Sequence, residues 1–432
     1  MGASRTGGGR GLAAALERDQ SCQERRVSDA QTIVQAWLDR CRREPSRTAL
    51  RHKRRGVWRS VSWRDYHENV ARMAVAIQRL GLRHGAVVSI VSESRPEWLY
   101  ADMASQALGC VSHGVYPTCS ASLIGLQLEV AGSDLVFVEN AEQAQKILGV
   151  DRPLPALRRI VVFDTRGLRE LKSERVLSLA DFMGDQPIVP ADMRRFEQQA
   201  GEVQKDDVAF VCATAGSTGA PRLAAITHAS AMRRARTMQA AFDARADDGI
   251  LCFVPLANAA ERMFSAVLPL LTPMQVHFAE SASTVANDLR EVQPDWVHAP
   301  ARFWEKLLAR TESTAVVASP MARRLYRRST DPACTDWMSG LSRRRLLHAM
   351  GLARARAGYS GGAAASASLS HWFRVLGLTL QDVYESAETC GPALRLPLAL
   401  SGGDAELGTD VKIGANDELL IRSDALFSGY WS

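Results

Sequence analysis

The sequence predicts an α/β protein built on doubly wound parallel sheets. Short apolar runs, such as residues 86–91 and 111–116, alternate with segments whose apolar residues recur at helical spacing, such as 63–80. Pro96 stands at the start of a second helix, where proline loses no hydrogen bond, and Gly109 stands at its end. Strands separated by such helices form parallel sheets with right-handed crossovers, and this alternation is the basis of the fold prediction.

The alternation continues along the rest of the chain. Residues 312–350 are rich in Arg and Ser with weak periodicity, which predicts surface helices and a mobile connection. Short alternating segments at 409–413 and 418–422 predict a small β element. The other expected strands are 134–139, 159–164, 250–255, 275–279, 296–298 and 379–384, and the other expected helices are 123–130, 141–148, 261–271, 288–292, 301–311 and 369–376.

These elements divide the chain into three expected parts. Residues 1–30 are Gly- and Arg-rich at their start and are expected to form a disordered basic tail. Residues 31–400 are expected to form a large domain of two α/β subdomains. Residues 401–432 are expected to form a small β subdomain that is cut short.

Composition and charge narrow the function classes. The chain has 432 residues and a formal charge of +6, but residues 1–60 alone hold 14 Arg and Lys against 6 Asp and Glu. The remainder is close to neutral, which argues against a nucleic-acid partner. A peripheral membrane contact through this basic N-terminal segment stays open beside a solvated surface. The eight cysteines form no Cys-x-x-Cys pair, so we expect a cytoplasmic protein without a disulfide framework.

The loop from Thr214 to Leu223, TAGSTGAPRL, carries the strongest chemical signal. It follows the apolar run 207–212, which predicts a buried strand that ends in the loop. Glycines let main-chain N–H groups approach a phosphate, hydroxyls add donors, and Arg222 supplies charge with two-pronged geometry. The loop therefore predicts a polyphosphate clamp, with an ordinary flexible turn as the alternative. It is not a Walker A loop, because no Gly-Lys-Ser/Thr follows the required glycine spacing.

Four further segments stand in a fixed order around this loop. They are FVPLANAAERM at 253–263, SGGA at 360–363, DVYESAET at 382–389 and ELLIRSDALFSGYW at 418–431. Each alone fits a structural role as a core helix, turn, strand end or hairpin. With the loop, and with the segments 93–118 and 278–307, their order resembles the adenylate-forming acyl-CoA synthetase and ligase superfamily, and within it the long-chain fatty acyl-CoA synthetases.

The resemblance implies a two-step reaction with ATP, Mg²⁺ and coenzyme A. A fatty-acid carboxylate attacks the α-phosphorus of ATP to give acyl-adenylate and pyrophosphate, and the thiol of coenzyme A then displaces AMP. Both steps need positioning and charge neutralisation more than covalent help from the protein. It further implies that the loop grips the β- and γ-phosphates, that a Gly-rich turn lines the adenine pocket, that an aromatic ring stacks on adenine, and that a carboxylate holds Mg²⁺. The matching positions here are Thr214, Ala215, Gly216, Ser217, Thr218 and Gly219 for the phosphates, Gly361, Gly362, Ala363 and Tyr384 for adenine, and Glu388 for Mg²⁺.

The sequence departs from the family pattern at positions that the resemblance assigns to substrate binding or catalysis. Arg222 stands where the family has lysine, and Ala215 replaces a loop serine. In the Tyr-Gly-x-Thr-Glu motif the glycine is Glu385, and the threonine that contacts the AMP phosphate is Ala387. Asn258, near the expected acyl entrance, stands where long-chain members usually have histidine. If Glu385 points inward, its charge should repel phosphate.

The end of the sequence is a further departure. Family members continue past Gly429-Tyr430-Trp431 to a ribose-binding aspartate, a hinge and a C-terminal lid domain with a catalytic lysine, and we expect this lid to be absent here. The sequence thus predicts an AMP-forming fatty acyl-CoA ligase of impaired competence. The alternative is a non-catalytic protein that binds nucleotide or an acyl chain. Peripheral membrane association through residues 1–60 is a third and weaker alternative.

Overall fold

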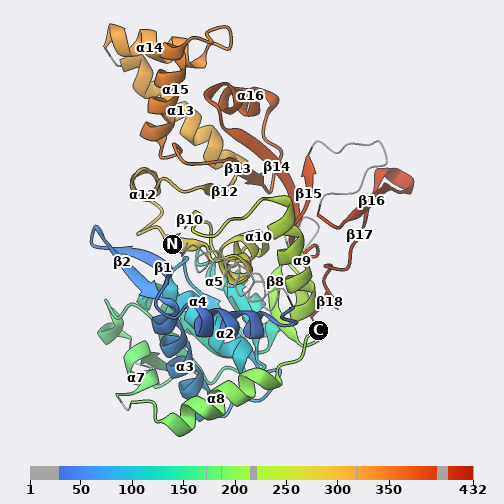
Figure 1. The fold of residues 1–432 in the computed structure, drawn as a ribbon. Coiled ribbons are helices and arrows are strands. Elements are labelled where there is room, and N and C mark those ends of the chain that lie inside the picture. Colours follow the sequence, from blue (N-terminus) through green and yellow to red (C-terminus); the bar gives the residue numbers. More distant parts are fainter. Residues whose placement is uncertain are drawn as a thin grey trace, which may run out of the picture.

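The computed structural model describes residues 29–171, 173–185, 187–214, 221–317, 319–396 and 407–431. Its core consists of two eight-stranded sheets. The first sheet has the order β18-β9-β8-β4-β3-β5-β6-β7, and the second has the order β15-β14-β13-β12-β10-β11-β1-β2. Figure 1 shows the two sheets and the helices that cover them.

The first sheet is doubly wound. Strands β4 and β5 pair in parallel with opposite sides of β3, which makes β3 the point where the strand order reverses. Helices α2, α3, α4 and α8 pack together on one face, and α5 and α6 cover the other. Its strands are β3 (Val87–Val91), β4 (Val111–Val115), β5 (Ser133–Val138), β6 (Arg159–Val162), β7 (Val176–Ser178), β8 (Val208–Ala213), β9 (Leu223–Thr227) and β18 (Gly429–Tyr430).

The second sheet is also mainly parallel, with antiparallel partners only at its ends. The pairs β1–β2 and β14–β15 are antiparallel, and the five pairs between them run parallel. Its strands are β1 (Thr48–Arg54), β2 (Val57–Ser62), β10 (Gly249–Cys252), β11 (Gln275–Phe278), β12 (Trp296–Pro300), β13 (Ala357–Gly361), β14 (Thr379–Ser386) and β15 (Gly391–Leu396). The predicted α/β class with doubly wound parallel sheets is therefore confirmed.

The helices follow the strands as the crossover rule requires. Serine or threonine caps several of them: Ser62 and Thr32 each form a complete capping box at the start of α3 and α2. The helices are α2 (Ile33–Arg43), α3 (Trp63–Arg79), α4 (Pro96–Ala107), α5 (Ala121–Ala131), α6 (Ala141–Leu148), α7 (Leu179–Met183), α8 (Pro190–Glu202), α9 (His228–Ala241), α10 (Ala259–Arg262), α11 (Leu268–Leu271), α12 (Val285–Val292), α13 (Ala301–Val317), α14 (Pro320–Thr330), α15 (Trp337–Met350) and α16 (Ala367–Leu376), with the short turns η1 (Leu168–Glu170), η2 (Met263–Val267) and η3 (Ala415–Asp417).

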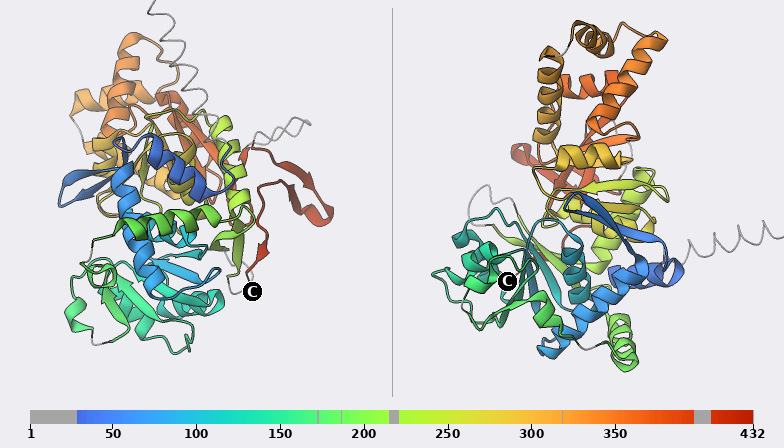
Figure 2. Two further views of the ribbon diagram at one scale, coloured as in Figure 1. Left: turned by 60° about the horizontal axis from the view of Figure 1, so that its bottom comes forward. Right: turned by 90° about the vertical axis from the view of Figure 1, so that its left-hand side faces the viewer.

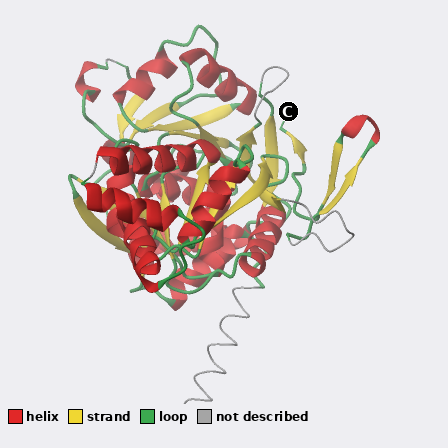
Figure 3. Ribbon diagram, turned by 90° about the horizontal axis from the view of Figure 1, so that it is seen from above, coloured by secondary structure: helices red, strands yellow, loops and turns green. Residues whose placement is uncertain are grey.

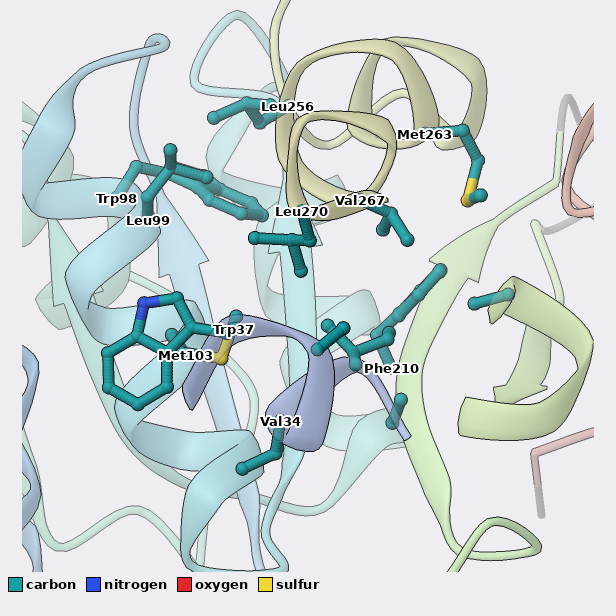
Figure 4. Packing of buried hydrophobic residues seen from close by; sticks show 14 of the residues in the cluster. Val34, Trp37, Trp98, Leu99, Met103, Phe210, Leu256, Met263, Val267 and Leu270 are labelled. Atoms are coloured by element: carbon teal, nitrogen blue, oxygen red, sulfur yellow. The ribbon is translucent and has the colours of Figure 1, made fainter. Parts of the chain in front are cut away.

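One large apolar cluster joins the two sheets. Figure 4 shows buried side chains of α2, α4, β8 and the segment 256–270 pointing toward one another. Such interlocking side chains stabilise the arrangement by removing apolar surface from water. The labelled members are Val34, Trp37, Trp98, Leu99, Met103, Phe210, Leu256, Met263, Val267 and Leu270.

Two parts stand away from this body. Helices α13, α14 and α15 project at one end of the molecule in all the views of Figures 1 and 2. The hairpin of β16 (Asp410–Ile413) and β17 (Leu419–Arg422) extends to one side, as Figure 3 shows from above. Residues 312–350, expected to be surface helices with a mobile connection, form the end of α13 followed by α14 and α15.

Candidate functional site

The two ends of the predicted phosphate loop lie side by side. Strands β8 and β9 pair in antiparallel register, and the N–H of Thr214 donates to the carbonyl of Arg222 at 2.8 Å. The N–H of Arg222 donates back to the Thr214 hydroxyl at 3.2 Å. The predicted clamp residues Ala215, Gly216, Ser217, Thr218 and Gly219 lie outside the described residues. Two hydrogen bonds, one between main-chain groups and one to the Thr214 hydroxyl, therefore join the two ends of the loop.

A three-residue contact joins Arg222 to Glu388. The Arg222 guanidinium carbon lies 3.7 Å from the ring centroid of Tyr430, which is cation–π geometry. The Tyr430 hydroxyl donates to Oε1 of Glu388 at 3.1 Å. Loss of solvent around the phenol and the Glu388 carboxylate raise the pKa of Tyr430, so it remains a protonated donor near neutral pH. The loop end and the candidate Mg²⁺ carboxylate are thus separated by one side chain.

Tertiary pairing places Tyr430 in this contact. Strand β18 joins the edge of the first sheet, where Tyr430 stands opposite Ala224 and Gly429 opposite Ala225. The N–H of Phe427 also donates to the main-chain carbonyl of Glu388 at 2.9 Å. Sequence reasoning did not place Tyr430 among the site residues, although its position eight residues after the short alternating segment 418–422 was visible. No local pattern indicated that this aromatic residue pairs with a strand some 200 positions earlier.

The candidate adenine residues sit at the ends of β13 and β14. These neighbouring strands run parallel, so their carboxyl ends meet at one edge of the second sheet. Gly361 is the last residue of β13, and Gly362 follows with a φ of +75°, a conformation that favours glycine. Ala363 comes next in the same turn, while Tyr384 is half-buried on β14 and Ala387 is buried just after it.

Glu385 lies against this edge and not in open solvent. A Cβ added to Gly361 would come within 2.3 Å of the Glu385 carboxyl carbon, so the carboxylate rests directly on the glycine. Its Oε2 is 3.2 Å from Nε2 of His298 on β12. The Glu385 charge is therefore paired with a histidine, and the expectation that it repels phosphate stays a prediction.

His298 is held between two carboxylates. Its Nδ1 is 2.8 Å from Oε2 of Glu261, and the ring stacks on Phe264 with centroids 4.7 Å apart. Burial lowers the pKa of His298, but hydrogen bonds and charges from Glu261 and Glu385 outweigh it and raise this pKa to about 10. The three side chains together carry a formal charge of −1 when the histidine is protonated. We call Glu261, His298 and Glu385 the buried triad.

Asn258 is connected to the same triad. Its side-chain oxygen accepts the N–H of Glu261 at 3.0 Å and thereby caps α10. Burial raises the pKa of Tyr116 to about 12, opposed by a hydrogen bond with the Asn258 side chain. The candidate acyl-entrance residue and the candidate adenine turn are thus linked through hydrogen bonds across Glu261, His298 and Glu385.

Metal binding has a limited basis in the described residues. Within them, no group of three or more His, Cys, Asp or Glu side chains could enclose a metal ion. Mg²⁺ in nucleotide sites is commonly held by one or two carboxylates together with substrate phosphates and waters. The half-buried Glu388 fits that mode, since its second carboxylate oxygen has no protein donor in the described part of the chain.

Comparisons with known proteins show which family the chain belongs to. Residues 37–431 match the family described as AMP-binding enzyme. The long-chain-fatty-acid–CoA ligase FadD15 of Mycobacterium bovis is 26% identical over 406 residues, which cover 87% of this chain and 64% of that protein. The long-chain-fatty-acid–CoA ligase heimdall of Drosophila melanogaster is 23% identical over 451 residues, which cover 96% and 66%. The chain thus spans about two thirds of the length of these relatives.

Solved structures share the fold. The N-terminal domain of FACL13 from Mycobacterium tuberculosis, solved with an inhibitor, superposes with a TM-score of 0.67 at 18% identity and covers 93% of this chain and 91% of that one. The anthranilate CoA ligase AuaEII, in complex with anthranoyl-AMP, gives a TM-score of 0.71 at 16% identity and covers 93% and 70%. With a family match over nearly its whole length, the chain belongs to the AMP-binding enzyme family.

Proposed function

We propose that the protein activates a long-chain fatty acid with ATP and transfers the acyl group to coenzyme A. In the first step a carboxylate oxygen attacks the α-phosphorus and pyrophosphate leaves. In the second step the thiol sulfur attacks the acyl carbon, loses its proton, and AMP leaves. The names of the curated relatives support this assignment, as does membership of the AMP-binding family.

The contact of Arg222, Tyr430 and Glu388 is the observation that carries the proposal. Phosphoryl chemistry needs cations and hydrogen-bond donors around the triphosphate. We assign Arg222 to the β- and γ-phosphates, together with main-chain N–H groups of residues 214–219. We assign Glu388 to Mg²⁺, which would neutralise phosphate charge when bound. Tyr430 would fix the position of both side chains, because it touches each of them.

The β13–β14 edge supplies the nucleoside half of the proposed site. We assign Gly361, Gly362 and Ala363 to the adenine edge and Tyr384 to its face, because an aromatic ring offers a large apolar contact at little entropy cost. Ala387 would face the AMP phosphate without a hydroxyl donor. The missing hydrogen bond would weaken binding or the transition state by about 1–3 kcal/mol.

Fatty-acid-dependent exchange of pyrophosphate into ATP tests the proposal. We expect exchange with hexadecanoate in the wild-type protein and a loss of about tenfold or more in Arg222→Ala, because a charge-assisted contact is worth about 1.5–3 kcal/mol. Arg233→Ala is a matched control, since Arg233 is a cation outside this contact that binds the carbonyl of Asp424. Equal exchange in both variants would contradict the role given to Arg222.

A non-catalytic binding protein is the second candidate, and the position of Glu385 favours it. Its carboxylate rests on Gly361, at the edge where the nucleoside is proposed to bind. In that case calorimetry would detect AMP or fatty acid binding, while exchange would be absent in the wild type and in the Glu385→Gly, Ala387→Thr double variant. Exchange in the double variant alone would instead identify the two substitutions as the cause of lost activity.

For partners and location we propose fatty acid, ATP and coenzyme A, with no nucleic acid, in the cytoplasm. The seven described cysteines are all free, as a reducing compartment favours. Within the described residues, no helix combines the length and apolarity needed to cross a bilayer. Peripheral contact through the basic N-terminal segment would need its unpaired cations, because Lys53 is bound to Asp288 and Glu291 at 2.9 and 2.8 Å. Vesicle sedimentation at low and at high salt tests that contact, because an electrostatic contact with anionic lipid weakens as the salt concentration rises.

We also propose that the chain divides into a basic tail at 1–30, an AMP-binding large domain at 31–400 and a small β subdomain at 401–432. Limited proteolysis would test this division. Preferential early cleavage near residues 30 and 400 is the expected result, because exposed connections between folded parts are cut first.

A further inference from the structure

A groove of about 640 Å³ is lined by helices α12, α13, α14 and α15, of which α13, α14 and α15 form the part that projects from the two sheets (Figure 1). That volume is in the range of small-molecule sites, about 300–1,000 Å³. Apolar side chains from three helices make up most of the lining. The main contributors are Leu307, Ala315, Leu325, Trp337, Met338 and Leu341.

Large apolar side chains at this groove are left open to solvent. Trp337 is 77% exposed, Met338 44% and Leu341 43%, and they occupy the first two turns of α15. A cluster of this kind costs free energy in water, and in globular proteins it commonly marks a surface that binds something. Leu307 and Met350, by contrast, are buried deeper in the same groove.

The only charged side chains among the described residues that line the groove are arginines. They come from three helices: Arg290 on α12, Arg310 on α13 and Arg345 on α15. Arg290 bonds to the carbonyl of Ala286 and to Asn287. Neither Arg310 nor Arg345 forms an ion pair with a described carboxylate, so both are available to an anion.

The surrounding sequence has the same charge bias. Residues 301–350 contain ten Arg and Lys against four Asp and Glu, a formal charge of +6 that equals the total for the whole chain. An anionic ligand would reduce the repulsion among these positive charges, and this favours its binding over that of a neutral ligand.

The groove is polarised along its length. On α15 the apolar residues Trp337, Met338 and Leu341 come first, and Arg345 follows one turn after Leu341, toward the end that packs on α12. Arg290 lies on α12 itself. A ligand with an apolar chain and an anionic head therefore matches the lining, with its head at the α12 end and its chain toward Trp337.

We propose that this groove binds a long-chain fatty-acid anion at a site separate from the proposed adenylation site. The acyl chain covers Trp337, Met338 and Leu341, and the carboxylate pairs with Arg310 and Arg345. The choice of a carboxylate among anionic amphiphiles rests on the proposed function, in which a fatty acid is the substrate. A flat lipid surface fits less well, because the lining residues come from four helices that surround a groove.

Quenching of tryptophan fluorescence by bromine-labelled hexadecanoate, used as a monomer, tests the proposal. Trp337 is one of nine tryptophans, so the part of the quenching that disappears in Trp337→Phe reports binding at the groove. We expect a saturable Trp337-dependent component in the wild type. The Arg310→Ala, Arg345→Ala double variant should bind at least tenfold more weakly, because charge-assisted contacts are lost. The matched control Arg344→Ala, an exposed neighbour outside the groove lining, should bind as the wild type does.

Three results would overturn the proposal. One is the absence of Trp337-dependent quenching in a protein whose circular dichroism is unchanged. Another is equal affinity for hexadecanoate and for uncharged hexadecanol. The third is Trp337-dependent quenching by phosphatidylglycerol vesicles carrying a brominated lipid but not by monomeric hexadecanoate, which would identify a membrane surface as the partner. Pyrophosphate exchange is measured separately, so failure of the proposed activity leaves this binding result intact.

Discussion

The buried triad allows a prediction of stability against pH. Replacing His298 by leucine removes the cation between Glu261 and Glu385, whose side chains are 1% and 9% exposed. Raising the pKa of His298 from 6.5 to about 10 makes its protonation worth roughly 4 kcal/mol of folding free energy at pH 7, at about 1.4 kcal/mol per pH unit. This value agrees with the cost of about 3–5 kcal/mol for breaking a buried ion pair by removing one partner.

The sign of the pH dependence follows from the raised pKa. The stabilising contribution is complete below pH 6.5, decreases as the pH rises, and is lost above about pH 10. The free energy of unfolding of the wild type should therefore exceed that of His298→Leu by several kcal/mol at pH 7 and by much less at pH 10. Urea unfolding followed by fluorescence and circular dichroism measures this difference, provided that the two transitions coincide.

A second buried histidine provides the control. Burial lowers the pKa of His228 to about 4, so its ring is neutral from pH 6 to 10. Because the unfolded-state pKa is about 6.5, the ring is mostly neutral in both states above pH 7, so the stability difference between the wild type and His228→Leu should change by only about 0.2 kcal/mol between pH 7 and 10. A His298→Leu difference below about 1 kcal/mol at pH 7, or one that does not change between pH 7 and 10, would refute the ion-pair assignment.

Three further predictions follow from packing and charge. Gly361→Ala should be destabilising, since its Cβ would meet the Glu385 carboxyl carbon at 2.3 Å, and Glu385→Gly in the same chain should remove most of that cost in thermal unfolding. Gly351→Ala should lower the unfolding free energy by more than about 1 kcal/mol, because φ is +84° and the new Cβ would lie 2.5 Å from the main-chain carbon of the facing helix. Asp102→Ala should lower the free energy of unfolding in urea by about 3–5 kcal/mol, because it leaves the fully buried Arg262 without its carboxylate partner. Asp102→Leu combined with Arg262→Met should lower it by less.

Much of the fold could be predicted from the sequence because it depends on local patterns. The apolar runs at 111–116 and 134–139 became β4 and β5, and the capped apolar stripe at 63–80 became α3. The spacing of apolar residues predicted helix type less reliably in segments that are buried on all sides. The helix expected at 261–271 is present as the uninterrupted run of α10, η2 and α11, but its π-helical middle was not predicted, since a segment surrounded by core on all sides has no polar face to reveal its pitch.

Long-range pairing was beyond the reach of sequence patterns. Composition marked residues 1–60 only as a basic segment, yet residues 51–54 within it belong to β1, which pairs with β11 more than 200 positions away. Their side chains are polar and mostly half-buried, as is common in an edge hairpin, so local composition could not distinguish a strand from a loop. The division of the chain near residue 400 and the roles of the site residues stay predictions.

The sequence by itself determined the α/β class, several of the strands and helices, and the place of the predicted phosphate loop directly after a buried strand, because each depends on neighbours in the chain. Only the tertiary structure decided that Glu385 faces His298, that Tyr430 lies between Arg222 and Glu388, and that arginines of three helices share one groove. The physical reason is that contacts between distant residues depend on how sheets and helices pack in three dimensions, which the period of a single segment does not record.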